Sequence, residues 1–407
     1  MLDTQTRSLV KATAPVLKEH GVALTRHFYA RMFEHNPELK AIFNQGHQRS
    51  GAQQQALAMA VAAYAEHIDN PGVLAPVLQL IAHKHVSLGI RREHYAIVGR
   101  HLLASIREVL GAEAATDELI AAWAAAYGQL AELLIGMEEG LYQAAATQPG
   151  GWTGWRGFRV QRKVAESDEI TSFYLVPADG GPVPGFVPGQ YVSVRVPVPE
   201  LGLHQPRQYS LSAAPGEQAL RISVKREAGQ GGEAATPAGM VSNVLHTQVQ
   251  EGDLIDVAPP MGDFVLDDQA EAPAVLISAG VGITPMMAML EHLVQRAPQR
   301  PVHFLHAARH GGAHAFGARV RELAGRHRAL QARIHYEHPR AQDQLGQHYD
   351  QAGRIELSAE QVSVLGANSQ YYLCGPRGFM QAQRQALQAA GVPAAHIHAE
   401  AFGTGGV

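Results

Sequence analysis

The sequence predicts a multidomain fold: an all-α domain, then an antiparallel β-barrel, then an α/β domain with a parallel sheet. Three observations support this order. Apolar residues recur with helical spacing up to about residue 146 and alternate with a period of two from about residue 152. From about residue 270, nearly continuous apolar segments alternate with helical ones, which is typical of a buried parallel sheet. We therefore expect domains at residues 1–146, 152–266 and 270–407.

The composition is typical of a globular protein with no nucleic-acid partner. The 407 residues are 46% apolar and 17% charged, and the net charge of −4 is not concentrated in a run of one sign. Apolar stretches stay too short to predict a transmembrane helix, and residues 1–7 lack the features of a signal peptide. The single cysteine, Cys374, excludes an intramolecular disulfide and a cysteine-ligated iron–sulfur site. We expect a cytoplasmic protein with no obligate protein partner.

The helical region carries a histidine on an apolar stripe. At about 100° per residue, His85 shares one arc with Leu78, Ile81 and Leu88, whereas His83 lies about 160° away and should face solvent or a loop. An imidazole on an apolar face needs a partner. This segment alone fits a core histidine bound to a backbone carbonyl as well as an axial haem ligand.

The barrel is predicted from short alternating segments separated by glycine and proline turns, at residues 158–164, 190–196 and 220–226. Four ordered motifs accompany them: Gly189-Gln190-Tyr191, Arg207-Gln208-Tyr209-Ser210, Gly239-Met240-Val241-Ser242-Asn243 and Gly262-Asp263-Phe264. The third motif leads into a predicted helix start, where backbone N–H groups and the Ser242 hydroxyl are suited to hold a phosphate.

The α/β region contains a glycine turn after the strand predicted at residues 274–278. In Gly280-Val281-Gly282-Ile283-Thr284-Pro285 the glycines allow a pyrophosphate to approach the backbone, and the following helix N-terminus attracts negative charge. Thr284 suits the N-cap and Pro285 the first helical position. The turn is not the G-x-G-x-x-G fingerprint, so it does not by itself predict a generic dinucleotide fold.

Residues 1 to about 146 resemble the globin family in the order and spacing of five residues: Tyr29, Phe43, Gln53, Leu57 and His85. The resemblance implies that His85 is the proximal ligand of the haem iron and that Phe43 packs on the haem. It also implies that Tyr29 and Gln53 donate hydrogen bonds to bound O2, while Leu57 gates the distal space. Taken singly, Tyr29 fits an ordinary core tyrosine and Gln53 a surface glutamine.

Further residues on the proximal side follow from the same resemblance. Tyr95 lies on an apolar face, so its hydroxyl needs a partner, and Glu138 lies at the edge of another apolar stripe. In similar globins, a tyrosine and a glutamate in these places form a network with the proximal histidine, which makes the imidazole more electron-donating. Glu139, about 100° further round, is expected to be solvated. Lys84 is a candidate for a salt bridge to the haem.

The remainder of the chain resembles the ferredoxin–NADP reductase family. This resemblance implies an FAD whose pyrophosphate contacts Arg207, whose ring packs on Tyr209 and whose N5 side faces Ser210. The expected flavin-binding set is completed by Gln190, Tyr191, Gln208, Val241 and Ser242.

The same family implies a pyridine nucleotide at the glycine turn, held by Gly280, Val281, Gly282, Ile283 and Thr284. The strand end Cys374-Gly375-Pro376 would lie near the nicotinamide, and Phe402-Gly403 would supply an aromatic ring that covers the flavin. NADH and NADPH both remain open, because Arg309 either contacts a 2′-phosphate or is solvated.

A globin followed by such a reductase is similar to the flavohaemoglobin family over nearly the whole chain. The resemblance implies haem b, FAD and NAD(P)H as cofactors, and a nitric oxide dioxygenase in which electrons pass from NAD(P)H through FAD to the haem. NO and O2 would be the substrates and nitrate the product, with a lipid in the distal haem pocket as a further partner to consider. Two alternatives stay open. One is a reductase of alkyl or lipid hydroperoxides, and the other is an oxygen-binding store or redox sensor, against which the fused reductase argues.

Overall fold

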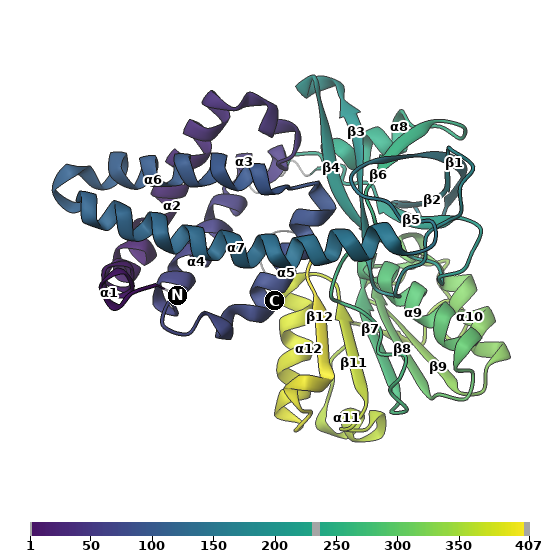
Figure 1. Ribbon diagram of the computed structural model, residues 1–407. Helices are drawn as coiled ribbons and strands as arrows, with labels where there is room; N and C mark the ends of the chain where they lie inside the picture. The colour runs from purple at the N-terminus through teal and green to yellow at the C-terminus, as the bar shows by residue number, and fades with distance from the viewer. Residues whose placement is uncertain (1, 230–236, 403–407) are drawn as a thin grey trace. The chain divides into compact units, whose positions relative to one another are not determined.

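The computed structural model describes residues 2–229 and 237–402 (Figure 1), which fall into two compact units. Met1–Arg156 and Arg195–Arg207 form the first, here called the helical unit. Gly157–Val194 and Gln208–Val407 form the second, here called the sheet unit. Residues 195–207 contain the end of one barrel strand, the start of the next and the turn that connects them. The periodicity of the sequence did not predict that this segment groups with the helices.

The described part of the helical unit up to residue 156 contains seven α-helices and two short 3-10 turns: α1 (Thr4–Ala12), α2 (Ala14–His35), η1 (Pro37–Ala41), α3 (Gln45–Ser50), α4 (Ala52–Glu66), η2 (Pro71–Leu74), α5 (Ala75–Leu88), α6 (Arg92–Ala114) and α7 (Asp117–Thr147). The start of α7 shows how the sequence sets a helix boundary. The Thr116 hydroxyl accepts a hydrogen bond from the Leu119 N–H at 3.2 Å, and Asp117 and Glu118 lie in the first turn.

Length and composition alone would allow α7 to cross a membrane, and the bent pair Pro71–Leu88 and Arg92–Ala114 is a further candidate by the same measure. Several apolar residues of α7 instead pack in the core of the helical unit. Trp123 and Ala126 pack in one core cluster of the helical unit with Phe28 and Met32, and Leu134 packs in a second. A core helix of a globular protein has this same pattern.

The antiparallel sheet has the strand order β4-β3-β6-β1-β2-β5. Its strands are β1 (Arg156–Ala165), β2 (Ile170–Pro177), β3 (Tyr191–Val198), β4 (Leu203–Ser210), β5 (Leu220–Lys225) and β6 (Leu254–Val257), and helix α8 (Met240–Thr247) lies between β5 and β6 in the chain. An antiparallel bridge between Leu211 and Ile222 joins the end of β4 to β5. The two outermost strands therefore meet, and the sheet closes into the predicted barrel.

The second sheet, with the order β10-β9-β8-β7-β11-β12, pairs its strands in parallel. Its strands are β7 (Ala274–Ala279), β8 (Val302–Ala308), β9 (Leu330–Tyr336), β10 (Gln351–Ala352), β11 (Gln370–Cys374) and β12 (Ile397–Glu400). The chain adds strands on one side of β7 and then returns to add β11 on the other. In such sheets ligands bind at this reversal, beyond the carboxyl ends of the strands.

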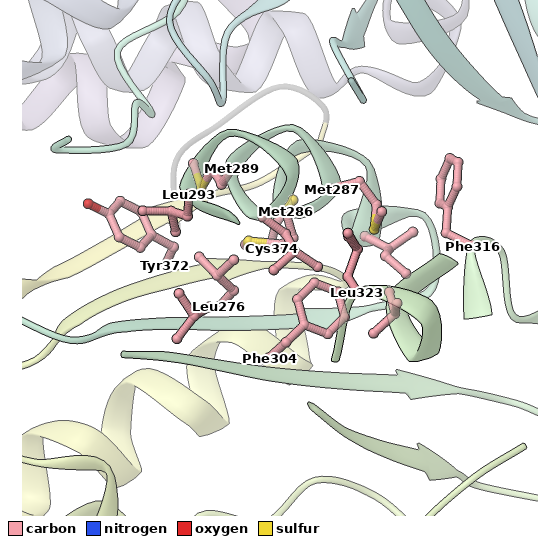
Figure 2. Close-up of a cluster of buried hydrophobic side chains, with 14 of the residues drawn as sticks. Leu276, Met286, Met287, Met289, Leu293, Phe304, Phe316, Leu323, Tyr372 and Cys374 are labelled. Atoms are coloured by element: carbon pink, nitrogen blue, oxygen red, sulfur yellow. The ribbon is translucent and has the colours of Figure 1, made fainter. Parts of the chain in front are cut away.

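Helices cover both faces of the parallel sheet because alternate residues of each strand point to opposite sides. Leu276 and Phe304 pack with α9 (Ile283–Arg296) and α10 (Gly317–Arg326) in one cluster (Figure 2), which also takes in Ile170 and Phe264 of the barrel region. On the other face, Val275 and Ile277 pack with residues of α11 (Ala359–Leu365) and α12 (Arg377–Ala389). The barrel and the nucleotide lobe (residues 270–402) thus share one continuous apolar cluster.

Candidate active site

The proximal histidine predicted from the sequence is held by a buried carboxylate. His85 Nδ1 lies 2.7 Å from Glu138 Oε1 and 3.1 Å from the Tyr95 hydroxyl. Tyr95 in turn donates to Glu138 Oε1 at 2.5 Å, and the Glu138 residue is only 2% exposed. Since an ionised carboxylate only accepts, Nδ1 carries the proton and Nε2 is the nitrogen left for a metal.

Burial raises the pKa of the Tyr95 hydroxyl, and its hydrogen bond to Glu138 raises it further. Tyr95 therefore stays protonated and keeps donating to the carboxylate. Glu139 is 63% exposed and pairs with Arg92 at 3.3 Å, as expected for a solvated neighbour. The three residues His85, Tyr95 and Glu138 come from α5, α6 and α7, so the packing of three helices sets the geometry.

Helix α5 buries more of its circumference than the sequence indicated. The expectation that His83 faces solvent or a loop is wrong: it is 8% exposed, with Nε2 3.1 Å from the Gln79 amide nitrogen. Buried positions run from Leu78 round to Ser87, an arc of about 180° at 100° per residue. His85 lies at the edge of that arc, with its side chain 32% exposed.

The distal candidates lie on α2 and α4. Tyr29 is 6% exposed, and its ring packs edge-on against Phe43 at 5.7 Å between centroids. Burial raises the pKa of Tyr29, and side-chain hydrogen bonds from Gln53 and Gln48 oppose that rise. Tyr29 therefore keeps its proton and remains a hydrogen-bond donor. Leu57 packs against the same core cluster as Tyr29 and Phe43.

These residues fit a haem. A neutral imidazole backed by a carboxylate is the usual arrangement for a metal-binding histidine, because the second hydrogen bond fixes the ring orientation and raises its basicity. Lys84 precedes His85 on α5, and its carbonyl accepts a hydrogen bond from Ser87 Oγ at 2.8 Å. A separate hollow of about 220 Å³ between α2 and α4 is lined by Leu17, Val22 and Ala58 rather than by Tyr29 or Gln53, so it is distinct from the expected distal pocket.

The flavin motif lies on β4 beside β3. Gln208 Nε2 donates to Ser193 Oγ of β3 at 3.1 Å, and Arg207 Nη1 donates to the Pro206 carbonyl at 2.7 Å. Tyr209 is half-buried and Ser210 buried. On the neighbouring strand, the Gln190 carbonyl accepts from the Leu211 N–H at 2.9 Å, and Tyr191 pairs with Met261.

Gly262 shows why the nearby turn needs a glycine. A Cβ at this position would lie 3.1 Å from the Tyr191 ring, and its φ of 118° also disfavours other residues.

Helix α8 begins at Met240, four residues before the start predicted at Val244, because Gly239 and not Asn243 is its N-cap. Ser242, 8% exposed, donates to the Gly239 carbonyl at 3.1 Å and accepts from the Glu227 N–H at 3.3 Å, while Val241 is 1% exposed. The hydroxyl of Ser242 thus braces the turn itself, and the backbone N–H groups of the first helical turn are what the helix offers to a phosphate. The phosphate-binding role of this turn remains a prediction.

The glycine turn of the nucleotide lobe forms a 3-10 turn, η4 (Gly280–Gly282), that continues directly into α9. The expectation that Thr284 is the N-cap and Pro285 the first helical residue is therefore wrong by two positions: the N-cap is Gly282 and the helix begins at Ile283. Thr284 Oγ1 instead donates back to the Val281 carbonyl at 3.0 Å. Pro285 remains in the first turn, where its missing N–H has no helical partner to lose.

The turn and the predicted nicotinamide-side strand end meet. Ser278 of β7 pairs in parallel with Cys374 of β11, and a Cβ on Gly282 would lie 2.2 Å from the Cys374 carbonyl oxygen. Only glycine permits this approach. Gly375 is similarly confined, since a Cβ there would lie 3.2 Å from Ala279. Gly280–Gly282 and Cys374–Gly375–Pro376 thus lie next to each other at the reversal point of the sheet.

Cys374 contacts the glycine turn through its backbone. Its side chain is fully buried in the apolar cluster with Met286 and Tyr372 (Figure 2), and burial raises the pKa of its thiol well above the usual value. The thiol therefore stays protonated. Phe402 is 43% exposed, just after β12, and Gly403 lies outside the described residues.

Arg309, which the sequence left open, forms an ion pair with Glu169 of the barrel. Two residues for which the sequence shows no signal also lie in the site region. Gln48, together with Gln53, opposes the rise that burial causes in the pKa of Tyr29. Gln205, fully buried, accepts from the Gln45 N–H at 3.0 Å and donates to the Lys40 carbonyl at 3.1 Å, which fixes the segment that carries Phe43.

Comparisons with known proteins agree with this geometry. Residues 26–134 match the globin family, and residues 276–385 match the oxidoreductase NAD-binding domain. A flavohemoprotein of Bordetella parapertussis is 64% identical over 408 residues, with 100% of both chains covered. One of Deinococcus radiodurans is 50% identical over 403 residues, covering 99% of this chain and 97% of that relative.

Two solved structures are also similar. The crystal structure of a flavohemoglobin from Malassezia yamatoensis with bound FAD and heme has a TM-score of 0.86 at 29% identity, covering 99% of this chain and 100% of that one. The FAD/NAD-binding domain of a nitric oxide dioxygenase from Vibrio cholerae has a TM-score of 0.54 at 38% identity, covering 61% of this chain and 98% of that one.

Fold, site and comparisons together define a class: an oxidoreductase in which a haem-binding globin is joined to a reductase that uses FAD and a pyridine nucleotide. Within that class, the chain belongs to the flavohemoprotein family. The predicted fold class and the cofactors haem, FAD and NAD(P)H are thereby confirmed.

Proposed function

We propose that this protein is a cytoplasmic, NAD(P)H-dependent nitric oxide dioxygenase that converts NO and O2 to nitrate and so removes NO. The observation that carries the proposal is the 2.7 Å contact between His85 Nδ1 and the buried carboxylate of Glu138. An imidazole made more electron-donating in this way favours activation of O2 over simple storage. The Vibrio cholerae dioxygenase domain, to which the reductase part is similar, adds support.

When bound, haem supplies the iron at which O2 and NO react, and FAD divides the electron pair of NAD(P)H into single electrons. The residues of this chain supply the rest. Glu138 holds the proton of His85 at Nδ1, which presents Nε2 to the iron. On the distal side, the Tyr29 hydroxyl keeps its proton because burial raises its pKa, so it can donate to a partly negative ligand. The Gln53 side chain opposes the effect of burial on the pKa of that hydroxyl.

On the reductase side, the chain orients two cofactors. Arg207, Gln208, Tyr209 and Ser210 would hold FAD along β4, and the backbone of Gly280–Gly282 with the start of α9 would hold the nucleotide pyrophosphate. The close packing of Gly282 on Cys374 fixes this turn against the end of β11. Arg309 is already paired with Glu169, so it offers no spare charge for a 2′-phosphate.

The test is NADH-driven turnover with each candidate acceptor. Because each NO consumed as nitrate needs one electron, the proposal expects two NO removed per NADH oxidised. Reduction of an alkyl hydroperoxide needs two electrons, so it would give one per NADH, and a sensor would give no steady turnover. Steady NO consumption that survives His85→Ala, or nitrate formation no faster than hydroperoxide reduction, would overturn the proposal.

A distal pair of variants separates binding from chemistry. Tyr29→Phe removes a donor that acts on bound O2, so we expect O2 to dissociate about tenfold or more faster, by the loss of a buried hydrogen bond to a charged ligand. Met59→Ala, on the exposed side of α4 with 63% exposure, is the matched control and should leave O2 dissociation unchanged.

A lipid in the distal haem pocket is a further partner that we propose. Organic extraction and mass spectrometry of purified protein test whether such a lipid is bound.

A further inference from the structure

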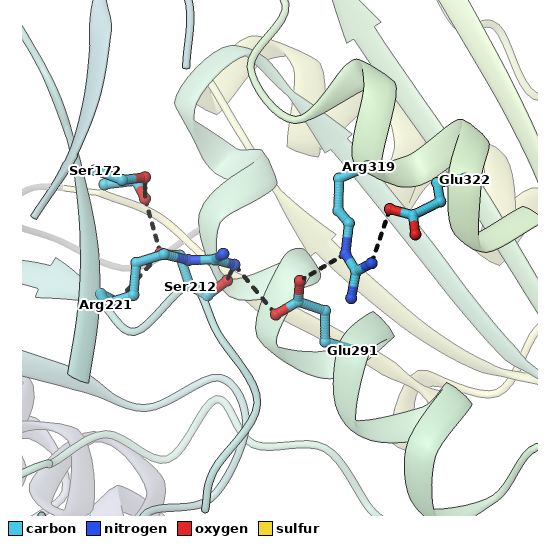
Figure 3. Close-up of polar contacts among 7 residues, drawn as sticks. Ser172, Ser212, Arg221, Glu291, Arg319 and Glu322 are labelled. Carbon is cyan, nitrogen blue, oxygen red and sulfur yellow. Dashed lines mark hydrogen bonds and ion pairs between the residues drawn. The ribbon is translucent and has the colours of Figure 1, made fainter. Parts of the chain in front are cut away.

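A buried ionic contact connects the barrel to the nucleotide lobe within the sheet unit (Figure 3). Arg221 Nη2 lies 3.2 Å from Glu291 Oε2, and the two residues are 8% and 6% exposed. Arg221 belongs to β5 of the barrel, whereas Glu291 belongs to α9 of the nucleotide lobe. No role in flavin, nucleotide or haem binding accounts for a charged pair at this depth.

On the barrel side, Arg221 is tied to the segment that follows the flavin motif. Its guanidinium donates to the Ser212 carbonyl and, through Nε, to Ser212 Oγ at 3.2 Å. Ser212 in turn joins a chain of buried hydroxyls, 2.7 Å from Ser223 Oγ, which lies 2.8 Å from Ser172 Oγ. Ser212 lies two residues after Ser210, so any shift of Arg221 is transmitted to the end of the flavin strand.

On the nucleotide side, Glu291 is fixed by a second arginine. Arg319 Nε of α10 donates to Glu291 Oε1 at 3.3 Å, and the same arginine pairs with Glu322 at 2.9 Å (Figure 3). The Arg221 guanidinium also lies over the ring of Phe316, 5.0 Å from its centroid. Phe316 is buried at the N-cap of α10 with φ at +61°, a backbone conformation uncommon for a residue with a bulky side chain.

The energetics favour a geometric role over a stabilising one. Removing two charges from water is costly, and replacing a buried ion pair by apolar residues of similar volume often leaves stability unchanged or raised. An ion pair instead restricts the relative orientation of the elements that carry it, because the guanidinium group fixes both the distance and the angle to its carboxylate. Apolar contacts in the surrounding cluster, such as Ile170 and Phe264 against the α9 methionines, would tolerate sliding of one lobe over the other.

We infer that Arg221 and Glu291 are a positioning pair that orients α9, and with it the nucleotide-binding turn at its start, against the flavin-binding strand β4. Glu291 lies two helical turns along α9 from Ile283, on a rigid element that carries its orientation to the Gly280–Gly282 turn. The rate that depends on this geometry is hydride transfer from NAD(P)H to FAD, in which the nicotinamide loses a hydride and the flavin gains it. This step precedes the haem, so the inference is independent of whether NO is the final acceptor.

The experiment compares Arg221→Met/Glu291→Met with Arg319→Met in the holoprotein. The double variant removes the buried ion pair between Arg221 and Glu291 without leaving either charge buried and unpaired. Arg319→Met is the matched control, because it also takes a partner from Glu291 but one from the same lobe. Flavin reduction by NADH is followed by anaerobic stopped-flow absorbance, together with its primary deuterium isotope effect and the Kd for NADH.

We expect the double variant to reduce its flavin about tenfold or more slowly with Kd changed less than about threefold, since small misplacements of reacting atoms cost such factors. Hydrogen exchange of residues 208–214, measured in FAD-free protein, should rise in the double variant and not in Arg319→Met. Flavin reduction within about twofold of the parent in both variants would overturn the inference.

A third variant keeps the test decisive if the double variant does not bind FAD. Arg221→Lys retains the positive charge but has no fork to reach Ser212 and Glu291 together. Slower flavin reduction at unchanged Kd supports the positioning role, and an unchanged rate contradicts it.

Discussion

Two buried carboxylates, one in each unit, are held in opposite ways. Glu138 of the helical unit accepts a hydrogen bond from neutral Tyr95 and faces the neutral imidazole of His85. Glu291 of the sheet unit lies between the guanidinium groups of Arg221 and Arg319. Among neutral donors, the charge of Glu138 remains available to polarise His85. Between two cations, the charge of Glu291 is compensated, so the remaining contribution of this side chain is to fix the orientation of the groups that it binds.

The contrast indicates that a buried glutamate polarises a histidine in one unit and orients a helix in the other. Replacing Glu291 alone should damage folding more than turnover, and replacing Glu138 should do the reverse. The predictions below test this contrast, beginning with the largest effect.

Glu291→Leu should lower the free energy of unfolding of the sheet unit by about 3–5 kcal/mol, because Arg221 is then buried without its counter-charge. Urea unfolding followed by the release of FAD fluorescence measures this loss. A change below about 1 kcal/mol would mean that water or other oxygen acceptors compensate Arg221, and the contrast with Glu138 would fail.

The sheet unit should also lose stability in acid. Burial lowers the pKa of His314 to about 4, and burial lowers the pKa values of His306 and His335 as well. The unfolded chain takes up a proton below about pH 6.5 and the folded one only near pH 4, so stability is full above pH 6.5 and falls between these values, by about 3 kcal/mol for His314.

Urea unfolding at pH 7 and pH 4.5 measures this dependence. His314→Gln retains a hydrogen-bonding group for the Tyr336 hydroxyl, 2.9 Å from His314 Nδ1, but cannot take up a proton. It should unfold with a weaker pH dependence than the parent. If the free energy of unfolding changes equally with pH in both proteins, His314 is not the acid-sensitive group.

Glu138→Gln should reduce NO-dependent turnover about 10- to 100-fold, as loss of a carboxylate behind a metal-bound histidine generally does. The fold should persist, because a glutamine oxygen still accepts from Tyr95. The Fe–His stretching frequency of the ferrous protein, measured by resonance Raman, should fall because Nδ1 faces a weaker acceptor. Glu139→Gln, one residue away and exposed, is the control and should leave both readouts unchanged.

The smallest effect is expected for Tyr95→Phe. The change removes the hydroxyl that donates to Glu138 and lies 3.1 Å from His85 Nδ1, but it leaves the 2.7 Å contact between Glu138 and His85. Turnover should therefore fall only about two- to tenfold. A loss equal to that of Glu138→Gln would show that Tyr95 and Glu138 act as one unit. Steady-state kinetics of both single variants and the double variant decide between these outcomes.

Much of this arrangement was predictable from the sequence because it rests on local patterns. The change from helical to alternating spacing indicated the order of helices, barrel and parallel sheet, which the structure confirms. The position of Glu138 at the edge of an apolar stripe did not by itself indicate its role, and its network with Tyr95 and His85 was predicted from the resemblance to globins. The start of α9 was misplaced by two residues, since the sequence does not reveal that a 3-10 turn merges with a helix.

Other features depend on contacts that no spacing encodes. His83 is buried because α5 packs on about half of its circumference, whereas a single-stripe argument assumes one buried face. Arg221 and Glu291 are 70 positions apart, and Arg221 alternates in a strand like any solvent-facing residue. Only the folding of the barrel against the nucleotide lobe brings the two charges together, so their pairing carries no local signal.

The bridge between Leu211 and Ile222 has a consequence for how the molecule behaves at high concentration. Exposed strand edges are templates for pairing with a second chain and thus for aggregation. Closing the barrel leaves its two outermost strands, β4 and β5, bonded to each other. The parallel sheet ends in β10 and β12, of two and four residues, which give little length for such pairing. The reductase lobes therefore offer few sites for the growth of intermolecular β-structure.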